Sequence, residues 1–146
     1  MGIQNYVVGK VMHEWALAES IVLGVAEYVK GVGGSAAKRV VVSLGELQAI
    51  DKEVFEFALK ELVRESPVKI GEIELIDEEA KFRCRLCGYV WRLKDVNLSE
   101  EVREAIHFVP EVVHTFLKCP KCGSRDYEVV SGRGVKVVSV EVIKDG

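Results

Sequence analysis

The chain has 146 residues, 49% of them hydrophobic and 29% charged, which suffices for one domain with an appendage or two small domains with a buried core. Its formal net charge of −3 argues against a general nucleic-acid binder, which needs a basic face to hold phosphate. We therefore expect no nucleic-acid partner. The sequence shows neither a signal peptide nor an apolar run long enough to cross a bilayer, so we expect no membrane partner either.

The first eleven residues precede a methionine at position 12 and look detached from the pattern that follows. Tyr6–Val8 has the composition of a short edge strand, and the whole stretch would equally suit a tail. A third interpretation is that the start is misassigned and that the native chain begins at Met12. We favour this third interpretation and treat residues 1–11 as an extension.

Two helices are predicted in the first half of the chain. The first begins near His13 and ends at Gly31, and its apolar residues recur at steps of three and four on one face: Trp15, Ala18, Val22, Val25 and Val29. Asp51 is placed to cap the second helix, which Ser66-Pro67 ends. The buried face of this second helix is predicted to consist of Phe55, Ala58, Leu59 and Leu62.

Three strands are predicted from alternating residues, at Arg39–Leu44, Lys69–Asp77 and Val135–Ile143. A small zinc module offers too little surface to bury the apolar face of the last strand, so we expect this strand to return and pair with the earlier two. The predicted fold class is an α/β (α+β) domain of two helices on a three-stranded sheet. This domain takes residues 12–79 plus 132–144, and a zinc-ribbon-like domain is inserted at residues 80–131.

The strongest signal is a pair of knuckles, Cys84-Arg-Leu-Cys87-Gly88 and Cys119-Pro-Lys-Cys122-Gly123, which contain all four cysteines of the chain. One tight turn presents both sulfurs of a knuckle to a cation, and two knuckles supply the four thiolates of a tetrahedral zinc site. Glycine after each knuckle permits the positive φ that folds backbone amides toward the sulfurs. Four protein ligands leave no open position, so the Zn2+ is structural. Disulfides or a redox pair are the alternatives, and cysteines at metal spacing favour the cytoplasm.

The loop between the knuckles, residues 88–118, is longer than the roughly 12–20 residues of commoner patterns. Because zinc closes the base of this loop, its two histidines, His107 and His114, are held near the metal. Ser99 is placed to cap a short helix that runs to about Ala105, and Pro110 interrupts the segment. The two histidines therefore need not share a helical face, and local packing is the alternative role for each.

Met12-His13-Glu14 opens the first predicted helix. If Met12 is the first residue, its amine, the His13 amide nitrogen and the His13 imidazole can bind one cation in a plane. Nitrogen ligands in such a plane favour Ni(II) or Cu(II) over zinc. Glu14 can hydrogen-bond the imidazole or approach the metal itself. The alternative is an exposed histidine at a helix start with no metal role.

Motifs of catalysis are missing from the sequence. It contains no phosphate-binding G-x-x-x-x-G-K-S/T loop and no G-x-S-x-G elbow. All four cysteines are assigned to zinc, which leaves no thiol nucleophile. We therefore predict that the chain is not an enzyme.

Three stretches together resemble the HypA/HybF hydrogenase maturation family: Met12-His-Glu-Trp-Ala-Leu-Ala-Glu-Ser20, Leu44-Gly-Glu-Leu-Gln48 and the two knuckles. The resemblance extends from Met12 to about Lys144, and the segment Ile106–His114 is similar to that of archaeal members. It implies a cytoplasmic nickel metallochaperone that delivers Ni2+ to the large subunit of a NiFe-hydrogenase, together with a nucleotide hydrolase of the HypB type. Urease is the alternative acceptor, and the chain is expected to be a monomer or homodimer.

The resemblance also assigns site residues. The nickel site maps onto Met12 and His13, with Glu14 beside them. His107 is matched to the histidine that completes this site, and His114 is the second choice. The structural zinc maps onto Cys84, Cys87, Cys119 and Cys122.

Two other functions stay open on the residues alone. A zinc-ribbon module for nucleic-acid binding or transcription needs a basic face, and residues 80–131 carry only nine Lys/Arg against seven Asp/Glu. A rubredoxin-like electron carrier is the other, because four cysteines also suit iron. The colour of the purified protein separates that carrier from a zinc protein.

Overall fold

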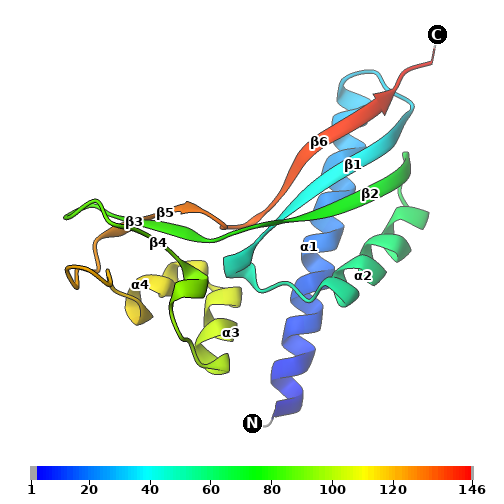
Figure 1. Cartoon of the computed structure of the whole chain (residues 1–146). Coiled ribbons are helices and arrows are strands. Elements are labelled where there is room, and N and C mark those ends of the chain that lie inside the picture. Colours follow the sequence, from blue (N-terminus) through cyan, green and yellow to red (C-terminus); the bar gives the residue numbers. More distant parts are fainter. Residues whose placement is uncertain (1–2, 146) are drawn as a thin grey trace. The chain divides into compact units, whose positions relative to one another are not determined.

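The structure is a computed structural model that describes residues 3–145, with side chains from His13 onward (Figure 1). The chain divides into two units: Met1–Ser43, Ile50–Ile76 and Lys136–Gly146 form the first, and Leu44–Ala49 with Asp77–Val135 form the second. This division departs from the predicted boundaries mainly at residues 44–49, and the two predicted domains stay a prediction. Within the described residues, no helix has both the length and the apolar character that a membrane crossing requires.

The first unit opens with the long helix α1 (Ile3–Gly31). The edge strand considered for Tyr6–Val8 is wrong, because these residues lie inside α1. Residues 3–12 contain no proline, and extending an existing helix costs less than nucleating a separate element. From residue 18 onward the predicted apolar stripe is buried, at Ala18, Val22, Val25 and Val29.

Helix α2 (Lys52–Arg64) begins as predicted, because Asp51 is its N-cap and accepts a hydrogen bond from the Val54 amide at 3.2 Å. Phe55, Ala58 and Leu59 form its buried face.

Strands β1 (Ala36–Gly45), β2 (Lys69–Glu78) and β6 (Val135–Ile143) form a sheet in the order β2-β1-β6, so the last strand does return to the earlier two. The fold class of two helices with a three-stranded sheet and a cysteine-bearing insertion is confirmed (Figure 1).

The second unit is built on a small antiparallel sheet of β3 (Lys81–Cys84), β4 (Val90–Arg92) and β5 (Tyr127–Ser131), in the order β4-β3-β5. Phe82 lies opposite Trp91 across β3 and β4, and Cys84 lies opposite Tyr127 across β3 and β5. Three aromatic rings pack together here, with the Phe82 centroid 5.4 Å from that of Trp91 and 5.5 Å from that of Tyr127.

The rest of this unit is helical. Short turns occur at η1 (Glu46–Gln48) and η2 (Leu93–Asp95). Ser99 caps α3 (Glu100–Phe108) as predicted, accepting from the Val102 amide at 3.2 Å, and α3 runs to Phe108 instead of stopping near Ala105. The turn η3 (Pro110–Val112) and the short helix α4 (Val113–Phe116) follow. The core of the unit consists of Leu47, Ala80, Phe82, Cys84, Trp91, Leu93, Ile106, Val113, Leu117, Cys119 and Tyr127.

Specific hydrogen bonds explain why residues 44–49 group with this unit. The Glu46 carboxylate accepts from the Ala80 amide at 2.9 Å, and the Gln48 side-chain oxygen accepts from the Gly134 amide at 3.2 Å. Between them, Leu47 is buried in the core just described. The stretch Leu44–Gln48 thus binds two backbone amides to one turn, that of Ala80 directly before β3 and that of Gly134 in the segment after β5.

Candidate metal centre

The four cysteines converge on one point of the second unit. Each is a free thiol, and all four sulfurs lie within 4.8 Å of one another. Sγ of Cys84 is 3.5 Å from Sγ of Cys122, and Sγ of Cys87 is 3.6 Å from Sγ of Cys119. A tetrahedron with zinc–sulfur bonds of about 2.3 Å has edges of about 3.8 Å. The observed separations therefore fit four thiolates around one zinc ion.

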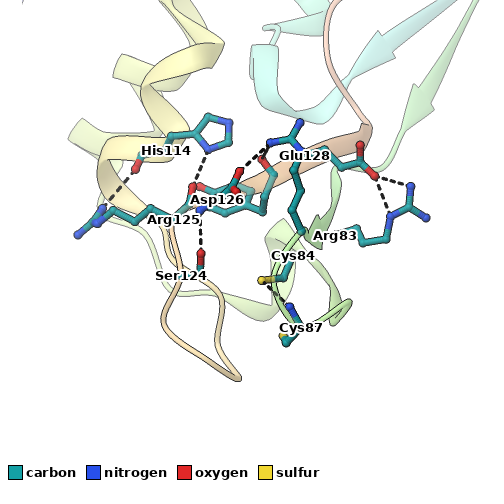
Figure 2. Close-up of polar contacts among 10 residues, drawn as sticks. Arg83, Cys84, Cys87, His114, Ser124, Arg125, Asp126 and Glu128 are labelled. Carbon is teal, nitrogen blue, oxygen red and sulfur yellow. Dashed lines mark hydrogen bonds and ion pairs between the residues drawn. The ribbon is translucent and has the colours of Figure 1, made fainter.

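Each knuckle is held by backbone hydrogen bonds that the sequence pattern anticipates. In the first, the Gly88 amide donates to the Cys84 carbonyl at 2.9 Å, and the Cys87 amide lies 3.4 Å from Sγ of Cys84 (Figure 2). In the second, the Gly123 amide donates to the Cys119 carbonyl at 2.9 Å. The two glycines have φ of 79° and 78°, the left-handed conformation that their lack of a Cβ permits.

The electrostatics of the sulfurs favour a cation. The Cys87 amide is the main cause that lowers the pKa of the Cys84 thiol to about 7, and burial opposes it. The Ser124 amide lowers the pKa of Cys122, but burial and the three neighbouring thiols outweigh it and raise this pKa to about 12. The four thiols together therefore resist losing all their protons in the absence of a cation. A bound divalent cation reverses this resistance, because each thiolate then pairs with positive charge.

The predicted nickel residues of the first unit lie within α1. Glu14 is fully buried, and its carboxylate accepts a hydrogen bond of 2.5 Å from the backbone amide of Asp51, the N-cap of α2. His13 precedes it and is half-buried, while the side chain of Met12 lies outside the described residues. Inside a continuous helix the His13 amide belongs to the helical hydrogen-bond ladder. An amine-anchored site therefore requires a chain whose first residue is Met12.

The two histidines of the insertion occupy different surroundings. His107 lies in α3 and is 0% exposed, with its ring centroid 5.0 Å from that of Phe108. His114 lies in α4 and is half-buried, with its ring centroid 4.3 Å from that of Tyr127. Its Nδ1 is 3.3 Å from the Arg125 carbonyl oxygen, so local packing and a backbone contact account for His114.

Sequence reasoning missed several residues that organise this centre. Tyr127 and Arg125 hold the end of α4, and Glu46 and Gln48 hold backbone amides from distant parts of the chain. The only sequence signal for the first two is their position directly after the second knuckle.

A helical and β-sheet unit joined to a four-thiolate unit defines a small metal-binding protein. Residues 12–142 match the family model "Hydrogenase/urease nickel incorporation, metallochaperone, hypA". The hydrogenase maturation factor HypA of Pyrococcus furiosus is 52% identical over 137 residues, covering 92% of this chain and 99% of that protein. HypA of Ignicoccus hospitalis is 36% identical over 125 residues, covering 83% and 89%. The chain therefore belongs to the HypA family.

Solved structures agree in fold. The solution structure of the nickel metallochaperone HypA from Helicobacter pylori superposes with a TM-score of 0.60 at 22% identity, covering 90% of this chain and 98% of that one. A second HypA solution structure gives a TM-score of 0.59 at 24% identity.

Membership of this family confirms the predicted class of function. The chain is a nickel metallochaperone of hydrogenase maturation, with nickel as cargo and a cysteine cluster suited to zinc. A metallochaperone carries a metal without transforming a substrate, which agrees with the prediction that the chain is not an enzyme. Its role implies interaction with the hydrogenase maturation machinery.

Proposed function

We propose that this chain binds one Ni(II) at the start of the Met12-His13-Glu14 segment and delivers it to the large subunit of a NiFe-hydrogenase. The nickel ligands are the Met12 amine, the His13 amide nitrogen and the His13 imidazole, and His107 supplies the fourth nitrogen. One zinc ion, held by the four cysteines, is structural. In this proposal the α/β domain, residues 12–79 plus 132–144, carries nickel and residues 80–131 form the zinc domain.

The observation that carries this proposal is the anchoring of Glu14. Its buried carboxylate meets the amide of Asp51 at the start of α2, where the helix dipole favours negative charge. The residue next to His13 is thereby fixed to a second helix, which supports a rigid position for the imidazole. Glu14 thus contributes to the site by holding it in place.

The chemistry of these donors suits nickel as a transferable cargo. Binding must displace protons from an amine, an amide and an imidazole, and a square-planar nitrogen field compensates for this loss better with nickel than with zinc. Because protons compete for the same donors, nickel affinity falls as the solution becomes more acidic. A terminal amine is also a mobile donor, which suits a protein that has to release its metal.

Nickel titration by calorimetry tests the ligand set. A form that begins at Met12 should bind one Ni(II) tightly, and a form that begins at Met1 should bind it weakly through imidazoles alone. His13→Ala should abolish tight binding with zinc content unchanged, because the two sites share no ligand. His107→Ala should weaken binding less, since three donors remain, and His114→Ala is the matched control that should bind normally.

Three outcomes of these measurements would contradict the assignment. Equal nickel affinity of the Met1 and Met12 forms would refute an amine-anchored site. A larger loss for His114→Ala than for His107→Ala would move the fourth ligand to α4. Loss of zinc in His13→Ala would show that the two sites are not separate.

The partner in this proposal is a nucleotide hydrolase of the HypB type, which docks on α1 and α2 near His13. Phe57 of α2 is 57% exposed and meets Trp15 of α1 edge to face, with ring centroids 6.0 Å apart. Exposed aromatic side chains of this kind are frequent anchors of protein interfaces. Phe57→Glu should weaken capture of the purified hydrolase, and Tyr28→Glu, at an equally exposed ring further along α1, should not.

The compartment in this proposal is the cytoplasm. All four cysteines are free thiols gathered within ligand distance of one another, and a reducing compartment keeps thiols available to a metal. Formation of cross-knuckle disulfides in protein isolated under anaerobic conditions would contradict this placement.

A further inference from the structure

The helical insertion between the knuckles ends on a helix too short to keep its shape alone. α4 spans only Val113–Phe116, and isolated helices shorter than about 12 residues are marginal in water. The last carbonyls of any helix also lack donors from the helix itself. The groups that hold α4 in place must therefore come from outside it.

Tyr127 supplies the first of these groups. Its side chain is fully buried, and its hydroxyl lies 2.9 Å from the carbonyl oxygen of Val113 and 3.2 Å from that of Leu117. These two carbonyls mark the beginning and the end of the last turn of α4. The Tyr127 ring also packs on the His114 ring, with 31° between the two planes. One side chain thus contacts the turn at both ends and in its middle.

Arg125 supplies the second group. Its guanidinium donates a hydrogen bond to the Thr115 carbonyl at 2.6 Å. It donates a second to the His114 carbonyl at 3.3 Å, which is drawn in Figure 2. The carbonyl oxygen of Arg125 lies in turn 3.3 Å from Nδ1 of His114. The backbone and the side chain of a single residue therefore both contact α4.

Both residues are fixed by the cysteine knuckles. Directly before Arg125, the Ser124 carbonyl accepts from the amide of Cys119 at 2.8 Å. Tyr127 lies opposite Cys84 in the pairing of β3 and β5. The segment that holds α4 is thus tied to the second knuckle at one end and to the first knuckle at the other.

We propose that Tyr127 and Arg125 are positioning residues through which the zinc site orders the helical insertion. Zinc fixes the two knuckles, the knuckles fix Tyr127 and Arg125, and these two side chains hold α4 and the segment that leads back to α3. The backbone of His114 then depends on zinc. This inference rests on the proposed function only through the assignment of the cysteines to zinc, and it needs no nickel.

Hydrogen exchange of the full-length chain, followed by mass spectrometry, tests the proposal without nickel. Tyr127→Phe should keep one zinc per chain, while the amides of residues 109–117 exchange about tenfold faster, the order expected when a hydrogen bond to a buried carbonyl is lost. Tyr89→Phe is the matched control, because Tyr89 is partly exposed on the first knuckle and should leave that segment unchanged. Removing zinc from the parent chain with EDTA should accelerate the same amides.

The decisive measurement is the combination of the two changes. If zinc acts on α4 through Tyr127, removing zinc from Tyr127→Phe should add little to the exchange of residues 109–117. Parent-like exchange in Tyr127→Phe, continued protection in the zinc-free parent, or fully additive effects would each overturn the proposal. Full zinc retention by Cys84→Ser would instead reject the zinc assignment of the proposed function, whatever Tyr127→Phe does.

Arg125 offers a second variant that does not disturb the core, because its side chain is exposed. Arg125→Ala should accelerate the same amides with zinc bound. Arg83→Ala is its control, because Arg83 pairs with Glu128 on the outside of the small sheet. Equal exchange in the Arg125 and Arg83 variants would show that Arg125 does not hold α4.

Discussion

Glu14→Ala is the sharpest test of how the first unit supports the Met12-His13-Glu14 segment. The change removes a buried carboxylate and leaves the Asp51 amide, 2.5 Å from it in the parent chain, without that acceptor. A hydrogen bond to a charged group contributes about 1.5–3 kcal/mol. The favourable placement of a carboxylate at a helix N-terminus adds about 0.3–1 kcal/mol. We therefore expect the free energy of unfolding of the first unit to fall by about 2–4 kcal/mol.

Thermal unfolding followed by far-ultraviolet circular dichroism measures this loss. In a domain of this size each 1 kcal/mol lowers the Tm by about 4–8 °C, so Glu14→Ala should melt at least about 8 °C below the parent chain. Glu27→Ala is the matched control, because Glu27 is exposed on the same helix and should change the free energy of unfolding by less than about 0.5 kcal/mol. A Tm for Glu14→Ala as close to the parent as that of Glu27→Ala would refute the anchoring role.

Glu14→Gln separates the holding role from direct metal binding. The amide side chain keeps an acceptor for the Asp51 amide and loses only the charge, so its Tm should fall by no more than about a third of the Glu14→Ala change. If Glu14 only holds the segment, Glu14→Gln in a Met12-initiated chain should bind nickel nearly as the parent does. If the carboxylate is a nickel ligand, the nickel affinity of this variant should fall sharply while its Tm stays high.

Three further changes probe the second unit. Phe82→Ala should lower its free energy of unfolding by about 3–5 kcal/mol in a urea titration, because a fully buried ring between two others is lost. Gly132→Ala should destabilise it more than Gly88→Ala, because both glycines have positive φ but only at Gly132 would a Cβ clash, 2.3 Å from Cα of Ala80. Burial raises the pKa of Tyr127 from 10.0 to about 12, so the stability that the neutral phenol contributes is complete below pH 10 and is lost between about pH 10 and 12. Tyr127→Phe should remove this loss, and a parent-like alkaline melting profile for that variant would contradict it.

The features that could be predicted from the sequence are those fixed by neighbouring residues. Asp51 and Ser99 were identified as helix caps because a cap bonds an amide only three residues away, and both bonds are present. The knuckles belong to the same category, since each needs only its two cysteines and the following glycine. The return of β6 was predictable for another reason, because an apolar strand must find a face to cover.

The features that could not be predicted depend on residues far apart in the chain. Nothing near Glu14 in the sequence indicates that its carboxylate meets Asp51, 37 positions later. Gln48 meets the Gly134 amide across 86 positions, which is why the role of Leu44–Gln48 became visible only in the fold. The predicted start of α1 is wrong for a different reason. The apolar stripe that indicates a helix begins after His13, whereas the helix itself begins at Ile3.

The zinc site and the nickel site proposed for this protein are of opposite kinds. The proposed zinc ligands lie in two knuckles closed by backbone hydrogen bonds, and two of the four cysteines, Cys84 and Cys119, are buried. Buried cysteines and closed knuckles favour retention of the metal. The proposed nickel donors include a terminal amine and an amide whose binding is opposed by protons, so modest changes in acidity or contact with a partner can reverse it. A carrier that must keep one metal while it gives up another requires this difference in rigidity, and it follows from where each set of ligands lies along the chain.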